Sequence, residues 1–368
     1  MIIFVNATAA DKGGLKTIVD QFLTFIKNKN DSNTYYVFVS TEQYIDFNFK
    51  GIKVLNVNKK RWIKRIIWDS YGLKRWSERN DIIPDKIISL QNTTVNYSEK
   101  VEQIVYLHTP IPFVNHKWKF FKKNELKLWL YKNIYPYFIT FYKNQNTFFI
   151  VQTNWLKKAL NKKLNINLEN IKVIRPNVEI EKNMDEKIIN FKKGNKTKVF
   201  FYPAMDYVYK NHTVLLEALK IIEDIDCELY RQIKITFTLD DKSDVFIKAE
   251  RLGLTQKIKF LGNIPFSEVL KNYSKADAVL FPSYIETFGL PLIEAANYSK
   301  KIICADEEYS REVIGKYKGA SFVNSMSANE WAKEIIHFCK SENNNELYNY
   351  EFSNLSDTWE VFYNQTLK

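Results

Sequence analysis

The most informative segment of this chain runs Ala278-Val-Leu-Phe-Pro-Ser-Tyr-Ile-Glu286-Thr-Phe-Gly289-Leu-Pro291-Leu-Ile-Glu294-Ala-Ala296. Its first four residues are apolar, which predicts the end of a buried strand, and the following Pro-Ser pair ends that strand. Pro291 suits the first helical position, because its missing N–H would have no partner there. The segment therefore predicts a strand, a short loop and a helix, the unit from which α/β folds are built.

The loop of this segment carries two acids and a glycine. Glu286 lies before the predicted helix, Glu294 lies about one turn inside it, and Gly289 leaves the backbone amides between them uncovered. A helix N-terminus with exposed N–H groups binds phosphate or sugar hydroxyls readily. These residues predict a site for a phosphorylated, hydroxyl-rich ligand. The alternative is an ordinary strand–loop–helix crossover whose acids only cap and solvate the helix.

The pattern Pro-Ser-x-x-Glu-x-Phe-Gly-Leu-Pro-x-x-Glu-Ala resembles the signature of the retaining glycosyltransferases of family 4, also called group 1. The resemblance implies a GT-B fold, in which two Rossmann-like, doubly wound α/β domains face each other across a cleft, and a nucleotide-sugar donor. It also implies that Glu286 binds donor-sugar hydroxyls and that Glu294 holds the ribose hydroxyls. Sugar and phosphate would be positioned by the amides around Phe288, Gly289 and Leu290.

Composition sets the class of the protein. With 368 residues, 45% hydrophobic and 26% charged, the chain is globular and long enough for two domains. No run approaches eighteen apolar residues, and the start has no positively charged leader, so we expect a cytoplasmic protein without a signal peptide. The three cysteines, Cys227, Cys304 and Cys339, are far apart and fit reduced thiols without metal-ligand spacing.

The formal net charge of +12 attracts nucleic acid, anionic lipid or phosphorylated substrates without choosing among them. The net charge is the sole argument for the hypothesis of nucleic-acid binding, so no nucleic-acid partner is predicted. Part of the excess of lysine can also reflect a nucleotide-biased genome.

The chain opens with a predicted strand, Ile2–Asn6, followed by a loop with Gly13 and Gly14 and an apolar-periodic helix, Leu15–Ile26. This order begins a doubly wound nucleotide-binding half, although the Gly-x-Gly-x-x-Gly fingerprint is absent. The resemblance implies that both glycines approach the donor diphosphate or sugar. Alternatively, the pair serves only the turn.

Further elements alternate along both halves. Strands are predicted at Tyr35–Ser40, Ile52–Val57, Lys86–Leu90, Gln103–Leu107, Thr147–Gln152, Lys198–Tyr202, Gln232–Leu239, Lys257–Leu261, Ala278–Phe281 and Lys301–Ala305. Pro176 and Asn177 break the pattern, and the polar stretch Glu179–Lys198 predicts an interdomain linker. We therefore expect an acceptor domain over residues 1–178, a nucleotide-sugar domain over 179–350, and a terminal helix within 351–368 that crosses back to the first domain.

His108 lies just past a predicted parallel strand, in the segment Leu107-His108-Thr-Pro110-Ile-Pro112. Ligands bind at such strand ends in open α/β sheets. The resemblance implies a strand-end His-x-Pro that lines the cleft, which makes His108 a candidate catalytic residue. A purely structural role is the alternative.

Two segments of the first half, residues 59–76 and 116–132, mix lysine and arginine with tryptophan and other aromatic residues. Helices of this composition can lie in a membrane interface, with their aromatic residues inserted and their cations near anionic head groups. The alternative is that they pack on the sheet with solvated lysines outside. In the resembled family this half binds the acceptor, which favours an anionic membrane surface that presents a lipid-linked acceptor.

Lys210 and Asn211 precede a predicted helix, Thr213–Ile222. A lysine there can place its ammonium against a phosphate held at the helix N-terminus, and the pair resembles the family's diphosphate-binding Lys-Asn motif. The arginine that the family often has five residues earlier is Met205 here, so one phosphate cation stays unassigned. A plain surface lysine is the alternative. By resemblance, backbone groups of Ile264 contact the nucleobase.

The sequence predicts no metal and no cofactor. Asp224-Ile-Asp226 follows a helix in a polar stretch and is interpreted as a solvated loop. Lys210 and the helix dipole at Gly289-Leu290 would instead stabilise the departing diphosphate. Glu286 and Glu294 share one loop and helix, so they are badly placed to flank a glycosidic bond, and hydrolysis is not expected.

These observations and the resemblance together predict a retaining, metal-independent hexosyltransferase. It would move a sugar from a UDP- or GDP-sugar to a glycan or lipid-linked glycan acceptor in bacterial capsule or O-antigen biosynthesis. The alternative is a GT-B nucleotide- or sugar-binding protein that has lost catalysis, against which the intact Glu286, Glu294 and Lys210 speak.

Overall fold

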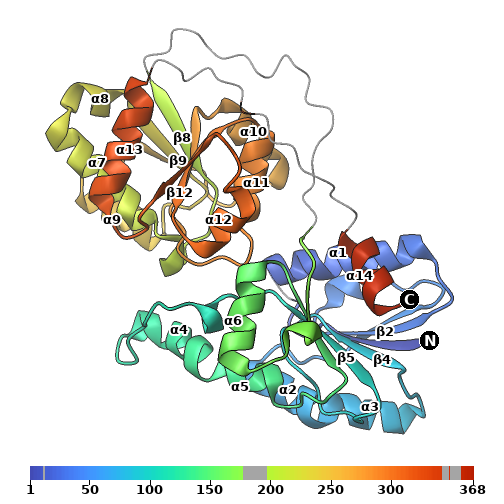
Figure 1. The fold of residues 1–368 in the computed structure, drawn as a ribbon. Helices are drawn as coiled ribbons and strands as arrows, with labels where there is room; N and C mark the ends of the chain where they lie inside the picture. The colour runs from blue at the N-terminus through green and yellow to red at the C-terminus, as the bar shows by residue number, and fades with distance from the viewer. Residues whose placement is uncertain (11–12, 177–196, 342–347, 349–357) are drawn as a thin grey trace. The chain divides into compact units, whose positions relative to one another are not determined.

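The computed structural model describes residues 1–10, 13–176, 197–341, 348 and 358–368 (Figure 1). The chain divides into two compact units. The N-terminal unit comprises residues 1–176 and 355–368, and the C-terminal unit comprises residues 177–354. The linker predicted over Glu179–Lys198 falls almost wholly on residues 177–196, outside the described part.

The N-terminal unit is built on a seven-stranded parallel sheet with the order β3-β2-β1-β4-β5-β6-β7. The strand order reverses direction between β1 and β4, the arrangement that creates a ligand-binding switch point in doubly wound sheets. The strands are β1 (Ile2–Asn6), β2 (Thr34–Val39), β3 (Ile52–Asn56), β4 (Lys86–Ser89), β5 (Glu102–Leu107), β6 (Thr147–Val151) and β7 (Ile171–Val173). The sequence predicted every one of these strands except the three-residue edge strand β7.

Helices of the N-terminal unit flank this sheet (Figure 1). They are α1 (Gly13–Lys29), α2 (Trp62–Ile67), the π-helical turn η2 (Trp68–Gly72), α3 (Leu73–Asn80), α4 (Lys123–Asn133), α5 (Tyr135–Thr140), α6 (Asn154–Leu164) and α14 (Thr358–Thr366).

The C-terminal unit repeats the plan with a six-stranded parallel sheet, β10-β9-β8-β11-β12-β13. The central pair β8–β11 again marks the switch point, which explains why the predicted strand Ala278–Phe281 is apolar throughout. Its strands are β8 (Lys198–Tyr202), β9 (Ile233–Phe237), β10 (Ile258–Phe260), β11 (Ala278–Phe281), β12 (Lys301–Ala305) and β13 (Ala320–Val323), and β13 was not predicted. Its helices are α7 (His212–Ile225), α8 (Cys227–Gln232), α9 (Asp244–Arg251), α10 (Phe266–Lys275), α11 (Leu290–Asn297), α12 (Glu308–Ile314) and α13 (Ala328–Lys340). The prediction of two Rossmann-like α/β domains is confirmed.

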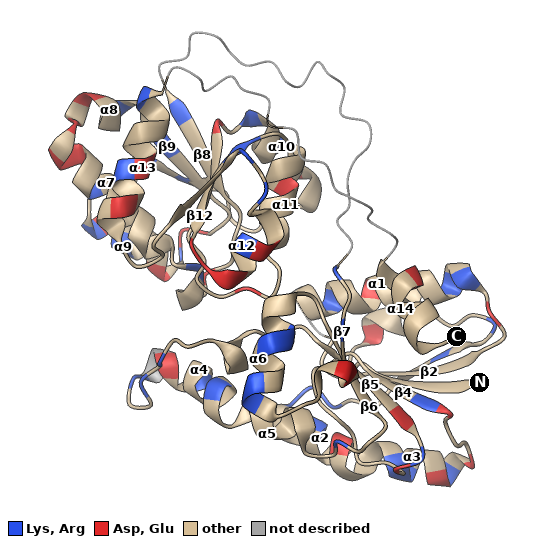
Figure 2. Cartoon of the chain, viewed as in Figure 1, with Lys and Arg blue, Asp and Glu red and all other residues tan. Residues whose placement is uncertain are grey.

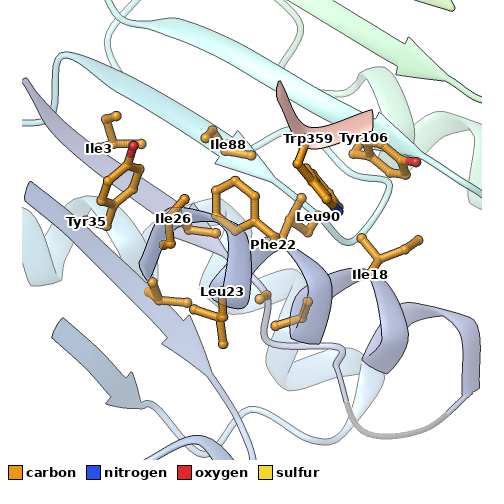
Figure 3. Close-up of a cluster of buried hydrophobic side chains, with 14 of the residues drawn as sticks. Ile3, Ile18, Phe22, Leu23, Ile26, Tyr35, Ile88, Leu90, Tyr106 and Trp359 are labelled. Carbon is orange, nitrogen blue, oxygen red and sulfur yellow. The ribbon is translucent and has the colours of Figure 1, made fainter. Parts of the chain in front are cut away.

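Helix α14 comes from the end of the chain but lies beside α1 in the N-terminal unit (Figure 1). Its Trp359 is buried, with its ring centroid 5.2 Å from that of Phe22 and 5.7 Å from that of Tyr106. Figure 3 shows this aromatic group between the sheet and α1. The last helix of the chain is therefore part of the core of the first unit.

Two interpretations of polar or basic segments need correction. Asp224-Ile-Asp226 is solvated as predicted but is not a loop, because α7 continues through Ile225 and Asp226 caps α8 by accepting a hydrogen bond of 3.0 Å from the backbone N of Leu229. Part of the basic-aromatic segment 59–76 is also internal. Trp68 and Leu73 are buried against Phe4 and Phe38, so these residues pack on the sheet.

None of the helices in the described ranges has both the length and the apolar character needed to cross a bilayer.

Replacing Trp359 with alanine should lower the free energy of unfolding of the N-terminal unit by about 3–5 kcal/mol, because the lost ring leaves a cavity between α1 and the sheet. Denaturant unfolding followed by circular dichroism measures the change. Glu360→Ala on the same helix is the control. Glu360 makes an exposed ion pair with Lys29 and accepts a hydrogen bond of 3.3 Å from Asn364, so its loss should change the stability far less. Equal effects of the two substitutions would contradict the packing role.

Candidate functional site

Lys210 and Glu286 meet at the carboxyl edge of the second sheet. Lys210 ends the short turn η6 (Val208–Lys210) after β8, and Glu286 lies in the loop after β11. The Lys210 Nζ donates a hydrogen bond to Oε1 of Glu286, and the two side chains are 17% and 15% exposed. Because β8 and β11 are parallel neighbours, the loops that follow them emerge side by side. The two residues that the sequence predicted as catalytic in this half therefore form one ion pair.

Backbone hydrogen bonds fix these two loops to each other. The backbone N of Tyr284 donates to the carbonyl of Tyr209 at 3.0 Å, and the Ser283 hydroxyl lies 3.3 Å from the same oxygen. The Tyr309 hydroxyl, from α12, donates to the carbonyl of Ser283 at 2.5 Å. The Lys210–Glu286 pair is thus held by a rigid frame.

Gly289 forms the N-terminal cap of α11 and has a left-handed φ of +84°. A Cβ at this position would lie 3.2 Å from Leu292 Cδ1 and 3.2 Å from Tyr309 Cε2. Glycine is therefore needed both for the backbone conformation and for space. Phe288 is buried, and Leu290 and Pro291 open α11, which begins four residues after Glu286. Pro291 has no N–H, and the backbone N of Leu292 donates to the carbonyl of Gly289 at 2.9 Å.

Glu294 lies one turn inside α11, as predicted, and is oriented by a residue that the sequence analysis did not select. The Tyr273 hydroxyl of α10 donates to Oε2 of Glu294 at 2.9 Å. Burial raises the pKa of Tyr273 well above its usual range, and the charge of Glu294 adds to this shift. Tyr273 therefore stays protonated and keeps donating to the carboxylate.

The remaining predicted donor-binding residues of this unit lie on loops at the same edge. Asn211 has a left-handed φ of 56°, and its Nδ2 donates to the carbonyl of Ser325 at 2.6 Å. The Tyr202 hydroxyl donates to the carbonyl of Lys210 at 2.7 Å. Ile264 is partly buried in the loop after β10. Asn211 therefore ties the lysine loop to the loop after β13.

His108, Gly13 and Gly14 belong to the N-terminal unit. The Oδ1 of Asn92 accepts a hydrogen bond of 2.7 Å from the backbone N of His108. The amide nitrogen of Asn92 then faces the ring and lies 3.3 Å from Nε2 of His108. Burial lowers the pKa of His108 to about 4, so the ring is neutral at pH 7. Gly13 begins α1 after the β1 loop, and no atom lies within 4 Å of a Cβ built on Gly14.

Within the described ranges, no group of three or more His, Cys, Asp or Glu residues could hold a metal ion. The described polar groups gathered here include one ammonium, two carboxylates and the N-terminus of α11. Such a set can bind an anion and several hydroxyls together.

Two Rossmann-like units, each with a doubly wound parallel sheet, are the architecture of the GT-B fold. Residues 183–351 match the family described as Glycosyl transferases group 1. Over this part of its length the chain is similar to the group 1 glycosyltransferases, the family that the sequence motif resembles.

The chain is similar to curated bacterial proteins over part of its length. It is 28% identical over 205 residues to the O-antigen chain mannosyltransferase RfbU of Salmonella typhimurium, covering 54% of each chain. It is 30% identical over 152 residues to the capsular polysaccharide biosynthesis glycosyltransferase CapH of Staphylococcus aureus, covering 40% of each. The chain thus spans about half the length of the curated relatives it matches, or less.

The fold is also similar to that of Anabaena Alr3699/HepE, solved in complex with UDP and glucose. The TM-score is 0.62 at 15% sequence identity, over 94% of this chain and 91% of that one.

Replacing Gly289 with alanine should destabilise the C-terminal unit more than the same change at Gly253. Both glycines have left-handed φ angles, so both substitutions cost about 1–2 kcal/mol of backbone strain. Only Gly289 has neighbours at 3.2 Å, whereas nothing lies within 4 Å of a Cβ at Gly253. Denaturant unfolding of the two variants measures the difference, and equal losses would show that the contacts to Leu292 and Tyr309 are not tight.

Proposed function

We propose that this chain is a retaining, metal-independent hexosyltransferase that uses a UDP- or GDP-sugar. Its acceptor is a glycan or lipid-linked glycan in the synthesis of a bacterial capsule or O-antigen. The observation that carries the proposal is the Lys210–Glu286 pair beside the open N-terminus of α11. The names of the relatives RfbU and CapH support the pathway, and the UDP complex of Alr3699/HepE supports the donor class.

The ion pair fits a site in which Lys210 and Glu286 each exchange the other for a group of the donor when the donor binds. Without a donor, the Lys210 ammonium and the Glu286 carboxylate neutralise each other in a mostly buried position. A donor brings phosphate oxygens for the ammonium and sugar hydroxyls for the carboxylate, so both charges stay paired. The amides at Phe288, Gly289 and Leu290 receive the phosphate, helped by the positive end of the α11 dipole.

In the proposed reaction, a hydroxyl of the acceptor attacks the anomeric carbon from the face that the diphosphate leaves. The bond between this carbon and the phosphate oxygen breaks, the new bond to the acceptor oxygen forms, and the hydroxyl proton passes to the departing phosphate. Lys210 and α11 stabilise the charge that develops on the leaving group. Glu286 stabilises the oxocarbenium-like sugar, and Glu294 holds the ribose hydroxyls. Neutral His108 acts as a hydrogen-bonding group and not as a cation.

An apolar patch of the N-terminal unit supports a role for an anionic membrane surface. The patch is defined by exposed apolar side chains of α2, of the segment before α4, of α4, of α5 and of the two residues that flank α5: Trp62, Ile63, Ile67, Phe120, Phe121, Leu130, Ile134, Tyr137 and Phe141. Phe121 is 95% exposed, and the rings of Trp62 and Phe138 lie 5.3 Å apart, so α2 and α5 adjoin. Figure 2 shows Lys and Arg along α4 and the neighbouring α6. Exposed aromatic residues bordered by lysines match an anionic lipid interface.

The patch gives the proposed enzyme a way to reach a lipid-linked acceptor. Its occupant would be the cytoplasmic leaflet, because the described cysteines Cys227, Cys304 and Cys339 are all free thiols, as in proteins of a reducing compartment. Acceptor binding and membrane binding would then be functions of the same unit.

Glu286→Gln and Lys210→Ala should each lower kcat about 10²–10³-fold, because each removes a group that stabilises the charge of the transition state. Turnover is measured with a panel of UDP- and GDP-sugars. A thermal shift for each sugar separates donor binding from chemistry, since a donor at about 100 Kd adds roughly 2.7 kcal/mol of stability.

Lys248→Ala and Glu217→Gln serve as controls, because these residues form an exposed ion pair of 2.6 Å in the same unit. They should leave turnover unchanged. A thermal shift without turnover in the unmodified protein would support the alternative of an inactive binding protein. Near-normal rates in the Glu286 or Lys210 variant would remove the proposed role.

Replacing Ile67 and Phe121 together with serine should weaken binding to vesicles of mixed neutral and anionic lipid by roughly tenfold or more, because less apolar surface enters the bilayer. Vesicle co-sedimentation measures the binding. Salt should weaken it for the unmodified protein, since the lysine contribution is screened. Ile225→Ser changes an exposed isoleucine of the C-terminal unit and should have no effect. Equal binding to purely neutral vesicles would argue against charge recognition.

A further inference from the structure

A buried carboxylate lies at the carboxyl edge of the first sheet. Asp69 is on the π-helical turn η2, between α2 and α3, and its side chain is buried. A π-turn inserts one residue into a helix and redirects the neighbouring side chains, and such turns are frequent at functional sites. The proposed reaction gives Asp69 no role.

The π-turn is held in place by its own residues and by Asn96. A Cβ on Gly72 would lie 2.5 Å from the Trp68 ring, so only glycine lets the indole pack against the turn. The backbone N of Asn96 donates to the carbonyl of Asp69 at 2.7 Å, and its Nδ2 donates to the carbonyl of Ser70 at 3.0 Å. The turn therefore aims the Asp69 side chain in one direction.

Three uncharged side chains donate to the Asp69 carboxylate. Oδ1 accepts from Nδ2 of Asn6 at 2.8 Å and from Nε2 of Gln91 at 2.9 Å, and Oδ2 accepts from the hydroxyl of Thr93 at 2.9 Å. A shell that consists of donors fits the ionised carboxylate, which can only accept.

Gln91 connects Asp69 to the loop after β1 by hydrogen bonds. Its Oε1 accepts from the Thr8 hydroxyl at 2.7 Å and from the backbone N of Ala9 at 3.1 Å. The next residue, Asn92, accepts from the backbone of His108 and faces its ring. One short segment, residues 91–93, therefore joins Asp69 to the β1 loop and to His108.

We propose that Asp69 is a positioning residue of the transferase site. As a carboxylate it orients Gln91 and thereby holds residues 7–10 of the β1 loop, and through the adjoining Asn92 it holds His108. The proposal rests on the proposed function for the roles of this loop and of His108. It adds a group that acts on them without touching the substrate.

The network should depend on pH near neutrality. Burial raises the pKa of Asp69 to about 7, although its hydrogen bonds and Arg65 of α2 oppose the shift. Of the other titratable groups nearby, His108 has its pKa lowered to about 4, and burial raises the pKa of Tyr135 of α5. Below pH 7 Asp69 gains a proton, and the protonated oxygen becomes a donor that faces groups which are themselves donors.

Activity and stability should then respond to pH in opposite directions. An ordinary aspartate in the unfolded chain has a pKa of about 4, and folding raises it. The stabilisation that this shift contributes is present below about pH 4 and is lost as the pH rises to about 7. The ionised form, which positions the loop, predominates only above that range.

The test compares the pH profile of kcat/KM for the donor in three variants. The unmodified protein should lose about tenfold between pH 8 and pH 6, as one group with a pKa near 7 becomes protonated. Asp69→Asn should have the low value throughout, with a flat profile. Gln91→Leu should also give a low kcat/KM with a flat pH profile. The double variant should have a kcat/KM no lower than that of either single variant, because both changes break the same connection.

Asp31→Asn is the matched control. Asp31 is also a partly buried acceptor, from the Tyr35 hydroxyl and from Nδ2 of Asn33, each at 2.8 Å, but it precedes β2 at the opposite edge of the sheet. This variant should keep the profile of the unmodified protein. A normal pH slope in Asp69→Asn, an equal change in Asp31→Asn, or multiplied losses in the double variant would overturn the proposal.

A second readout separates this proposal from the proposed function. Hydrogen exchange of the backbone amides in residues 7–10 should be faster in Asp69→Asn than in the unmodified protein, and faster in the unmodified protein at pH 6 than at pH 8 after correction for the intrinsic rate. This result is expected even if no sugar is transferred. Unchanged exchange in the variant would refute the positioning role, whatever the enzyme activity.

Discussion

The parallel pairing of β8 with β11 is the constraint on which the candidate site depends. Ala278 pairs with Phe200 and Val279 with Phe201, and the Asp277 carboxylate accepts from the backbone N of Val199 at 2.7 Å. Since both strands run the same way, the loops after them must leave from one edge. A lysine and a glutamate separated by 76 residues in sequence are thereby placed in hydrogen-bond contact. Neither residue needs its own scaffold, because the sheet supplies the position of both.

The two units each hold a carboxylate near the ends of their strands, but in different electrostatic surroundings. In the C-terminal unit, the Glu286 carboxylate faces a charged partner and keeps some exposure, so a ligand can replace either side of the pair. In the N-terminal unit, the Asp69 carboxylate is buried among neutral donors that are themselves held by backbone contacts. A buried charge that loses its hydrogen-bond partners has a high free energy, so this carboxylate does not exchange them readily. The first arrangement suits binding, and the second suits the fixing of loops.

Much of the fold and part of the site could be predicted from the sequence. The strands were predicted well because central parallel strands are continuous apolar runs, whereas the short edge strands β7 and β13 carry no such run. Lys210, Glu286 and Gly289 were found because each lies at a break between a strand and a helix. Tyr273 and Tyr309 were missed because they approach from α10 and α12, and their hydroxyl contacts depend on tertiary packing. Asp69 was missed because a π-turn has no clear sequence signal, and its neighbours suggested a basic-aromatic surface.

The same segment shows why aromatic content alone does not identify a surface. Trp68 and Trp62 both lie in the basic stretch that begins at Lys59, yet Trp68 is buried against Phe38 while Trp62 is exposed and contacts Phe138. The two residues are six positions apart, and in the π-turn that starts at Trp68 the residues Asp69 and Ser70 are buried as well. The turn therefore does two things at once. It buries the second tryptophan, which anchors α2 to the core, and it directs Asp69 at the strand ends. The burial of Trp68 and the placement of Asp69 both belong to this turn, so a larger residue at Gly72, which would meet the Trp68 ring, should disturb both.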